Sequence, residues 1–208
     1  MTFERPGGRR RPRTALISLV AALAVGVAAC GGSSSSSGGS AAKPVNPNGP
    51  EVSPSGDIPD NQAYVAYRPP GGGYSVKVPE GWARSTSGRG VAFTDKLNTI
   101  QMQATPASAP MSVARALRSE VPRLARTEQG FQAGKVSMVS RTAGRATRIT
   151  YLADSRPDPV TGKVRRNAVE RYVFFHGGRD VVLTLSGPKG ADNVEPWKIV
   201  TDSVRWTR

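Results

Sequence analysis

Four long segments in the second half of the chain alternate between apolar and polar side chains, and this pattern constrains the fold more than any other feature. The segments cover residues 132–140, 144–153, 165–176 and 179–186. Alternation with a period of two is typical of β-strands that bury one face. The connections are turn sequences, among them Ala143-Gly144 and His176-Gly177-Gly178. Strands joined by such turns pair antiparallel, so the sequence predicts a four-stranded meander.

Four shorter strands and a helix are expected before the meander. The strands are predicted at Tyr64–Tyr67, Tyr74–Val78, Gly90–Thr94 and Thr99–Ala104. Residues 109–126 place apolar side chains at helical spacing and arginines on the other face, which indicates an amphipathic helix. We expect Pro122 to bend this helix or to end it early, because an interior proline costs around 3 kcal/mol.

A second helix is expected near the C-terminus. Asp192 and Glu195 are predicted to cap its first turn. Its apolar face is formed by Val194, Trp197, Val200 and Val204. The order of elements therefore predicts an α+β domain, in which one twisted antiparallel sheet has a helix packed on each side.

The N-terminus has the features of an export signal. Five arginines within residues 1–13 precede the apolar run Ala15–Ala29, which is shorter than the roughly 20 residues of a spanning helix. The run ends in Val27-Ala28-Ala29-Cys30, which resembles the lipobox of bacterial lipoproteins. The resemblance implies cleavage between Ala29 and Cys30 and a lipid anchor on Cys30, at the extracytoplasmic face of the cell membrane. A retained transmembrane anchor is the alternative, and the general secretory route is favoured over twin-arginine export.

Three parts of the chain follow from these features. Residues 1–29 are predicted to be a cleaved signal peptide, 30–61 the lipidated cysteine with a flexible linker, and 62–208 the folded domain. The linker consists mainly of Gly, Ser, Pro and Asn and lacks the large apolar side chains that packing requires. We expect it to be a disordered tether that lifts the domain off the lipid surface.

Two motifs at the ends of the domain resemble those of PsbP-like domains. Residues 74–82, Tyr-Ser-Val-Lys-Val-Pro-Glu-Gly-Trp, are similar to the opening Y-x-V-x-x-P-x-G-W of that family. Residues 197–206 are similar to its closing W-x-x-I-x-x-S-x-x helix. The resemblance implies a PsbP-like fold and a docking or assembly module with no shared catalytic apparatus. From their size and apolarity, we expect Trp82, Trp197 and Trp206 to be core residues rather than ligand platforms.

The residues that commonly carry catalysis are scarce in this chain. The chain has one Cys and one His, which excludes a Cys/His zinc cluster, and His176 is expected at an exposed hairpin tip. The sequence contains none of the standard nucleophile or nucleotide-binding motifs. The carboxylate pairs Asp154 with Asp158 and Glu80 with Asp95 lie in or beside predicted turns, where such groups are normally solvated. We therefore expect no enzyme activity, no cofactor and no metal.

The chain is strongly basic, with 29 Lys and Arg against 15 Asp and Glu, a formal net charge of +14. The candidate patch for an anionic partner comprises Arg145, Arg148, Lys163, Arg165 and Arg166, which the predicted pairing of two strands is expected to bring together. An anionic headgroup, an anionic envelope polymer or an envelope protein fits such a patch. The alternative is that these side chains are scattered over the surface and solvated, and that the many arginines reflect only the base composition of the genome. Nucleic acid is not expected, because an exported protein rarely meets it.

These observations favour a lipid-anchored, non-enzymatic docking module of the cell envelope. The second hypothesis is a carrier of a hydrophobic, lipid-like ligand between sheet and helix, in a cavity lined by Leu117, Phe131, Tyr151, Phe174 and Trp197. A simpler role for these five side chains is to fill the core. The third hypothesis, a hydrolase of wall material, requires an acid/base pair that the sequence does not show.

Overall fold

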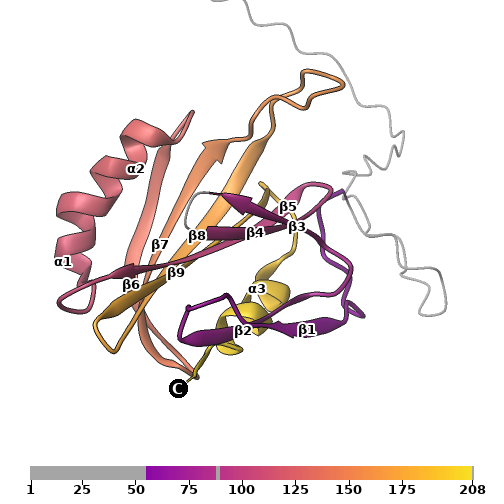
Figure 1. Cartoon of the computed structure of the whole chain (residues 1–208). Helices are drawn as coiled ribbons and strands as arrows, with labels where there is room; N and C mark the ends of the chain where they lie inside the picture. Colours follow the sequence, from indigo (N-terminus) through magenta and orange to yellow (C-terminus); the bar gives the residue numbers. More distant parts are fainter. Residues whose placement is uncertain (1–54, 88–89, 208) are drawn as a thin grey trace, which may run out of the picture. The chain divides into compact units, whose positions relative to one another are not determined.

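Antiparallel strands form the main sheet of the computed structural model, which describes residues 55–87 and 90–207. In this part of the chain the sheet has seven strands in the order β3-β4-β5-β9-β8-β7-β6 (Figure 1). They are β3 (Ala83–Ser87), β4 (Gly90–Asp95), β5 (Asn98–Pro106), β6 (Gln132–Arg141), β7 (Gly144–Asp154), β8 (Arg166–His176) and β9 (Arg179–Pro188). The meander β6-β7-β8-β9 confirms the prediction from the four alternating segments.

A second, smaller sheet corrects the expectation of a single sheet. It has the order β1-β2-β10, with β1 (Tyr64–Tyr67), β2 (Tyr74–Pro79) and β10 (Arg205–Trp206). Strand β10 was not predicted, because two residues are too few to show alternation. It pairs with β2 through Arg205 opposite Ser75 and Trp206 opposite Tyr74. The partner of β2 is therefore a segment that returns only after the last helix, which no local pattern reveals.

Strand β3 was also missed, and its burial explains why. Ala83, Arg84, Ser85 and Thr86 are all exposed, so this edge strand has no buried face and no alternation of apolar and polar residues. It pairs with β4, and Arg84 lies opposite Phe93. The sheet thus continues one strand beyond the predicted hairpin.

The first helical segment begins later and continues further than predicted. It consists of α1 (Val113–Arg115), a π-helical turn η1 (Ala116–Glu120) and α2 (Val121–Thr127). The hydroxyl of Ser112 accepts a hydrogen bond from the Arg115 N–H at 3.1 Å and caps the start. The Val121 N–H donates to the Ala116 carbonyl, five residues back, so the turn before Pro122 is widened. This widening accommodates a residue without an N–H, and the helix does not end there.

The last helix, α3 (Val194–Asp202), buries Pro196, Trp197, Val200 and Thr201. The predicted cap by Asp192 and Glu195 is wrong, because Asn193 occupies the N-cap position and its side chain makes no bond to the helix. The Asn193 side chain instead accepts from the Ile58 N–H at 2.8 Å and donates to the Asn98 Oδ1 at 3.1 Å. It joins three separate parts of the chain.

The main sheet has a packed layer on each face, which confirms the α+β class (Figure 1). On one face α3 and the small sheet cover a core that includes Tyr74, Phe93, Ile100, Met102, Phe174, Leu183, Leu185, Trp197 and Val200. On the other face the segment α1–α2 covers Ile149, Tyr151 and Val169 with Ala116 and Leu124. Trp197 is a core residue as predicted, whereas Trp82 and Trp206 are half-buried and pack against the margin of the core.

The packed domain starts before the predicted boundary at residue 62. Ile58 is 4% exposed and belongs to the core under α3. The predicted signal peptide, Cys30 and the linker up to residue 54 lie outside the described residues. No helix among the described residues is long and apolar enough to cross a membrane.

Candidate functional site

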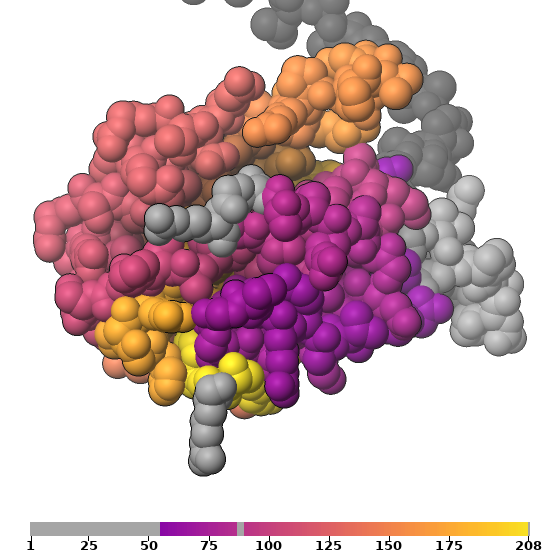
Figure 2. Space-filling model, viewed as in Figure 1, coloured from indigo at the N-terminus to yellow at the C-terminus, as the bar shows by residue number. Residues whose placement is uncertain are grey.

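A polar groove crosses the face of the main sheet beside α2. Its volume is about 620 Å³, within the range of ligand-binding clefts. The helix α1–α2 covers only the part of this face near β7 and β8, so side chains of β5 and β9 remain uncovered. The groove floor is formed by hydroxyl and amide side chains, namely Thr99, Gln101, Gln103, Asn167, Thr184 and Ser186. Figure 2 shows this region as a recess between α2, the β7–β8 loop and the β4–β5 hairpin.

Cationic side chains outnumber carboxylates around the groove. The cations are Lys96, Arg123, Arg156, Arg165 and Arg171, and the carboxylates are Glu128, Asp154 and Asp158. The cations come from the β4–β5 hairpin, α2, the β7–β8 loop and β8. Lys96 and Arg156 are exposed and have positions on the rim. The groove therefore carries a positive surplus above a neutral, hydrogen-bonding floor.

One partly buried ion-pair cluster fixes the helix side of the groove. The Arg171 Nε lies 2.8 Å from the Glu120 Oε1, and the two side chains are 12% and 13% exposed. The Arg123 Nη2 lies 2.6 Å from the same oxygen, and the Arg171 Nη1 donates to the Thr184 Oγ1 at 2.7 Å. Burial acts to raise the pKa of Glu120, but the hydrogen bonds and charges of Arg123 and Arg171 outweigh it and lower that pKa. Glu120 is thus held as a carboxylate.

The structure does not bring the five predicted patch residues together. Strands β7 and β8 do pair, but Asp154 lies opposite Arg166 at one end and Ala146 opposite Phe174 at the other. Arg145 therefore lies at the opposite end of the strand pair from Arg166. Arg145 and Arg148 also point to opposite faces, because they are three residues apart in a strand. The register of the pairing, which the sequence pattern did not fix, separates them.

Carboxylates partner three members of the predicted patch. Arg166 pairs with Asp154 at 3.0 Å, Arg148 with Glu170 at 3.6 Å, and Arg165 with Asp158 at 4.0 Å. Lys163 is an exposed loop residue. Of the five, Arg165 lines the polar groove and Arg148 lines a different groove, under α3. Sequence reasoning missed Lys96, Arg123, Arg156 and Arg171 as groove residues, because only tertiary packing places the hairpin, helix and loop around one recess.

The predicted acid/base candidates have structural partners. Asp154 binds Arg166, and Asp158 accepts bonds from the backbone N–H groups of Val160 and Thr161. The bonds from Thr161 and Val160 lower the pKa of Asp158. His176 stacks on Trp206 with 4.6 Å between ring centroids. Within the described residues, no group of three His, Cys, Asp or Glu is placed to hold a metal.

The second acid pair and the predicted carrier cavity are also located. Glu80 lies in the β2–β3 turn and Asp95 at the β4–β5 hairpin. The predicted lining residues lie on different surfaces: Leu117 is 53% exposed, Phe131 packs on Tyr151 on the α1–α2 face, and Phe174 and Trp197 lie on the α3 face. They do not line one cavity, because alternate residues of a strand face opposite sides of the sheet.

Comparisons with known proteins give similar structures but no matching family. No family model matches the sequence, and no curated protein matches it. The structure is similar to the Ran-binding protein Mog1p of Saccharomyces cerevisiae, with a TM-score of 0.49 and 10% identity over 70% of this chain and 96% of that chain. It is similar to PsbP (CyanoP) of Synechocystis, with a TM-score of 0.48 and 14% identity over 70% and 93% of the two chains. It is also similar to LpqN of Mycobacterium tuberculosis, described as involved in cell envelope biogenesis, with a TM-score of 0.39 and 15% identity over 72% and 87%.

These likenesses assign no function to the chain, because all three identities are 15% or lower and all three TM-scores are below 0.5. The PsbP-like expectation has a counterpart in CyanoP, which is among the similar structures. A shared fold does not imply a shared function.

Proposed function

We propose that this protein is a non-enzymatic binding module that docks an anionic, hydroxyl-rich envelope polymer in the polar groove. The observation that carries the proposal is the combination of a hydroxyl and amide floor with a surplus of cations on the walls and rim. Floor groups such as Gln101 and Thr184 exchange hydrogen bonds with sugar or polyol hydroxyls. Rim groups such as Lys96 and Arg156 attract the carboxylates or phosphates of the same polymer.

The groove is built for binding without large rearrangement. Its floor consists of neighbouring strands of one sheet, whose spacing is set by backbone hydrogen bonds. Arg171 is held by Glu120 and by the Thr184 hydroxyl, so its guanidinium orientation is fixed in advance. Pre-organisation of this kind reduces the entropy lost on binding.

The state of the groove carboxylates supports binding over hydrolysis. A general acid needs a raised pKa, whereas the hydrogen bonds from Thr161 and Val160 lower that of Asp158. Asp154 is occupied by Arg166 at 3.0 Å. The lowered pKa of Asp158 does not suit the donation of a proton to a glycosidic or phosphodiester bond.

We further propose that a lipid on Cys30 holds the module at the outer face of the cytoplasmic membrane. This part of the proposal rests on the likeness of Val27-Ala28-Ala29-Cys30 to a lipobox. Each buried lipid CH₂ contributes about 0.8 kcal/mol, so two or three chains anchor a protein stably. An anchored domain with an anion-binding groove meets envelope polymers at high local concentration.

The test measures binding of the full-length protein in detergent to polygalacturonate, with dextran as the uncharged polymer. We expect binding to polygalacturonate that weakens as salt rises and weaker binding to dextran. The double variant Arg156→Gln/Arg165→Gln, on the groove, is expected to lower the affinity for polygalacturonate about tenfold.

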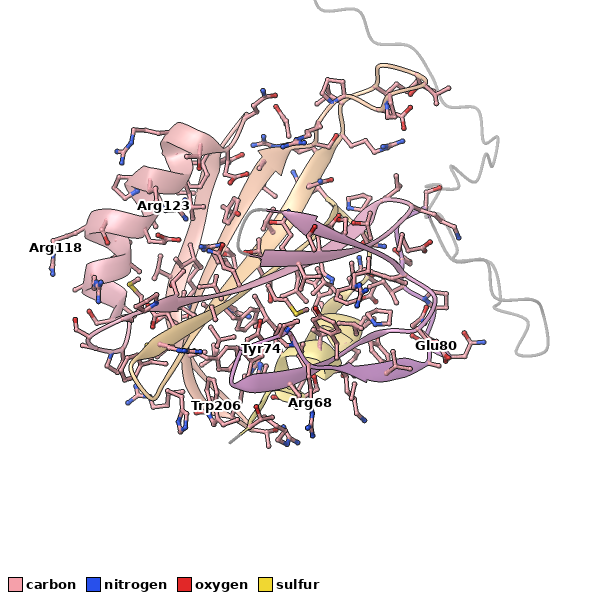
Figure 3. All side chains as sticks on the ribbon, viewed as in Figure 1. Arg68, Tyr74, Glu80, Arg118, Arg123 and Trp206 are labelled. Atoms are coloured by element: carbon pink, nitrogen blue, oxygen red, sulfur yellow. The ribbon has the colours of Figure 1, made fainter. Side chains whose placement is uncertain are left out.

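The matched control is Arg118→Gln/Arg126→Gln. It removes the same charge from helix positions that do not line the groove, and Figure 3 shows Arg118 pointing away from the sheet. This control is expected to bind nearly as well as the wild type. Equal losses of affinity in the two double variants would overturn the proposal, because net charge would then explain the binding. Equal binding of both polymers would also overturn it, because nonspecific adsorption would then explain the binding.

A further inference from the structure

A second groove lies on the opposite face of the main sheet, between α3 and strands β6 to β8. Its volume is about 460 Å³, and its apolar walls include Leu152, Ala168, Val194 and the ring of Trp197. This volume is in the range of small-molecule sites. The groove shares β7 and β8 with the polar groove but is lined mainly by their alternate residues, so its lining chemistry is different.

Two buried N–H groups in the walls of this groove have no hydrogen-bond partner among the described residues. They are the Arg148 Nε and the Trp197 Nε1. Trp197 as a whole is only 8% exposed. Buried donors are nearly always paired in folded proteins, so these two unpaired donors, one on β7 and one on α3, indicate that the groove lacks hydrogen-bond acceptors.

Positive charges outnumber negative charges around this groove. Arg148 pairs with Glu170 at 3.6 Å, and Arg141 lies 3.6 Å from Asp202. The Glu170 carboxylate also accepts a short hydrogen bond from the Tyr172 hydroxyl at 2.5 Å. Lys198 reaches the same Asp202 at 2.7 Å. Three cations therefore share two carboxylates, which leaves this group with a net charge of one positive unit.

We propose that this groove binds a small amphipathic anion, whose carboxylate or phosphate accepts hydrogen bonds from Arg148 and Trp197. The apolar body of the ligand lies along Leu152, Ala168 and Val194. The two nitrogens have almost no exposed surface in the free protein, so binding includes movement of the Arg148 and Trp197 side chains toward the ligand. An anionic head group of the ligand accepts the hydrogen bonds of Arg148 and Trp197 and also balances the net positive charge. A neutral head group accepts the hydrogen bonds but does not balance the charge.

The test follows the indole N–H resonance of Trp197 by NMR in the full-length protein in detergent. The probes are decanoate, decyl phosphate and decanol, each added as a monomer below micelle formation. We expect saturable shifts of this resonance with decanoate, with decyl phosphate or with both, and at least tenfold weaker binding of decanol. The stronger of the two anions identifies the source of the head group, either a fatty acid or a lipid phosphate.

Two variants of the same strand provide the matched comparison. Arg148→Met is expected to weaken anion binding at least tenfold, whereas Arg145→Met, on the opposite face of β7, is expected to have no effect. Trp197→Phe removes the indole N–H but no hydrogen bond of the free protein, and it serves as the second variant if Arg148→Met does not fold. Its binding is then followed through the Lys198 amide, and a tenfold loss is again expected.

Three results would overturn the proposal. One is the absence of any Trp197 shift with all three probes in the wild type. Another is equal binding of decanol and the anions, and the third is an equal effect of Arg145→Met and Arg148→Met. Because the two grooves lie on opposite faces, failure here leaves polygalacturonate binding unaffected, and the two proposals fail independently.

Discussion

Arg171 in the main sheet and Glu120 in the π-helical turn form a largely buried ion pair, with 2.8 Å between the Arg171 Nε and the Glu120 Oε1. The pair joins β8 to the helical segment across the wall of the polar groove. Glu120 also accepts from Arg123, so one carboxylate compensates two guanidinium groups. The π-helical turn therefore coincides with the contact that fastens the helix to the sheet.

Glu120→Gln is expected to destabilise the protein by about 3 kcal/mol, because removing one partner leaves the buried charge of Arg171 uncompensated. Unfolding in urea measures the change. The control is Glu128→Gln, which removes a carboxylate that also lines the groove but makes none of the ion pairs seen here; its effect is expected to stay within about 0.5 kcal/mol. Equal costs for the two variants would contradict the assigned importance of the Arg171 pair.

The same pair makes stability depend on acid. Burial acts to raise the pKa of Glu120, but Arg123 and Arg171 outweigh it, and the pKa in the folded state is lowered. The pair contributes stability above the pKa of Glu in the unfolded chain, and this contribution is lost as pH falls through the folded value. Urea unfolding between neutral pH and pH 3 is expected to show a weaker acid loss for Glu120→Gln than for the wild type. Identical pH profiles of stability for Glu120→Gln and the wild type would contradict this prediction.

Asp180 is expected to affect the pH dependence of stability in the opposite direction to Glu120. It is 6% exposed, and burial raises its pKa, partly offset by the charge of Arg115. A raised folded pKa stabilises the protein below the unfolded pKa, and this contribution is lost as pH rises through the folded value. Asp180→Asn is therefore expected to be more stable than the wild type at pH 7, with the advantage disappearing in acid. A less stable variant at pH 7, measured by urea unfolding, would contradict this.

The parts of the fold that sequence predicted are those with a strong local signal. The strands β6 to β9 alternate over about ten residues each, and α3 places Trp197 and Val200 on one face, so their identification needed no tertiary information. Strand β3 and strand β10 gave no such signal, the first because it is exposed and the second because it is two residues long. The split into two sheets follows from pairings that local patterns do not contain.

The candidate site was less predictable than the fold, and β7 shows why. The sequence indicated that Arg145 and Arg166 lie on paired strands, which is correct. Their separation depends on the register, in which Asp154 and not Arg145 lies opposite Arg166. Arg171 was not predicted as a groove residue, because Glu120 and Thr184 contact it from distant parts of the chain. The excess of Lys and Arg predicted a positively charged surface, but it did not predict where the charged side chains lie.

A buried asparagine pair fastens the first described residues to the end of the sheet. Asn193 accepts from the Ile58 N–H at 2.8 Å and donates to the Asn98 Oδ1 at 3.1 Å, and both asparagines are under 5% exposed. A Cβ on Gly187 would collide with the Asn98 Oδ1 and lie 2.9 Å from the Asn193 Nδ2. Gly187→Ala is therefore expected to break this network.

The expected cost of Gly187→Ala is about 1–3 kcal/mol, since buried polar groups lose their partners. Hydrogen exchange gives a local readout, because the Ile58 amide is expected to lose protection before the amides of β8 do. The control is Asn167→Ala, a half-buried asparagine in the polar groove, with an expected cost within about 0.5 kcal/mol. Unchanged Ile58 protection in Gly187→Ala would show that the network is not what holds this segment.

Cys30 is the single thiol of the chain, so its replacement tests the predicted anchor without touching the domain. Cys30→Ala is expected to accumulate as a precursor that keeps residues 1–29 and takes up no labelled palmitate, because a lipobox without cysteine offers no sulfur for lipid attachment. Intact-mass measurement and palmitate labelling of cells that express the variant provide the readout.

Ser34→Ala is the matched control for the anchor, because it lies just beyond the predicted cleavage site and keeps the thiol. Its processing and labelling are expected to equal those of the wild type. If Cys30→Ala were cut to the same mature length and still partitioned with detergent, the anchor would have to lie elsewhere. The groove would then bind its polymer without the high local concentration that a lipid at Cys30 gives. The affinity of the groove for polygalacturonate alone would decide whether docking occurs.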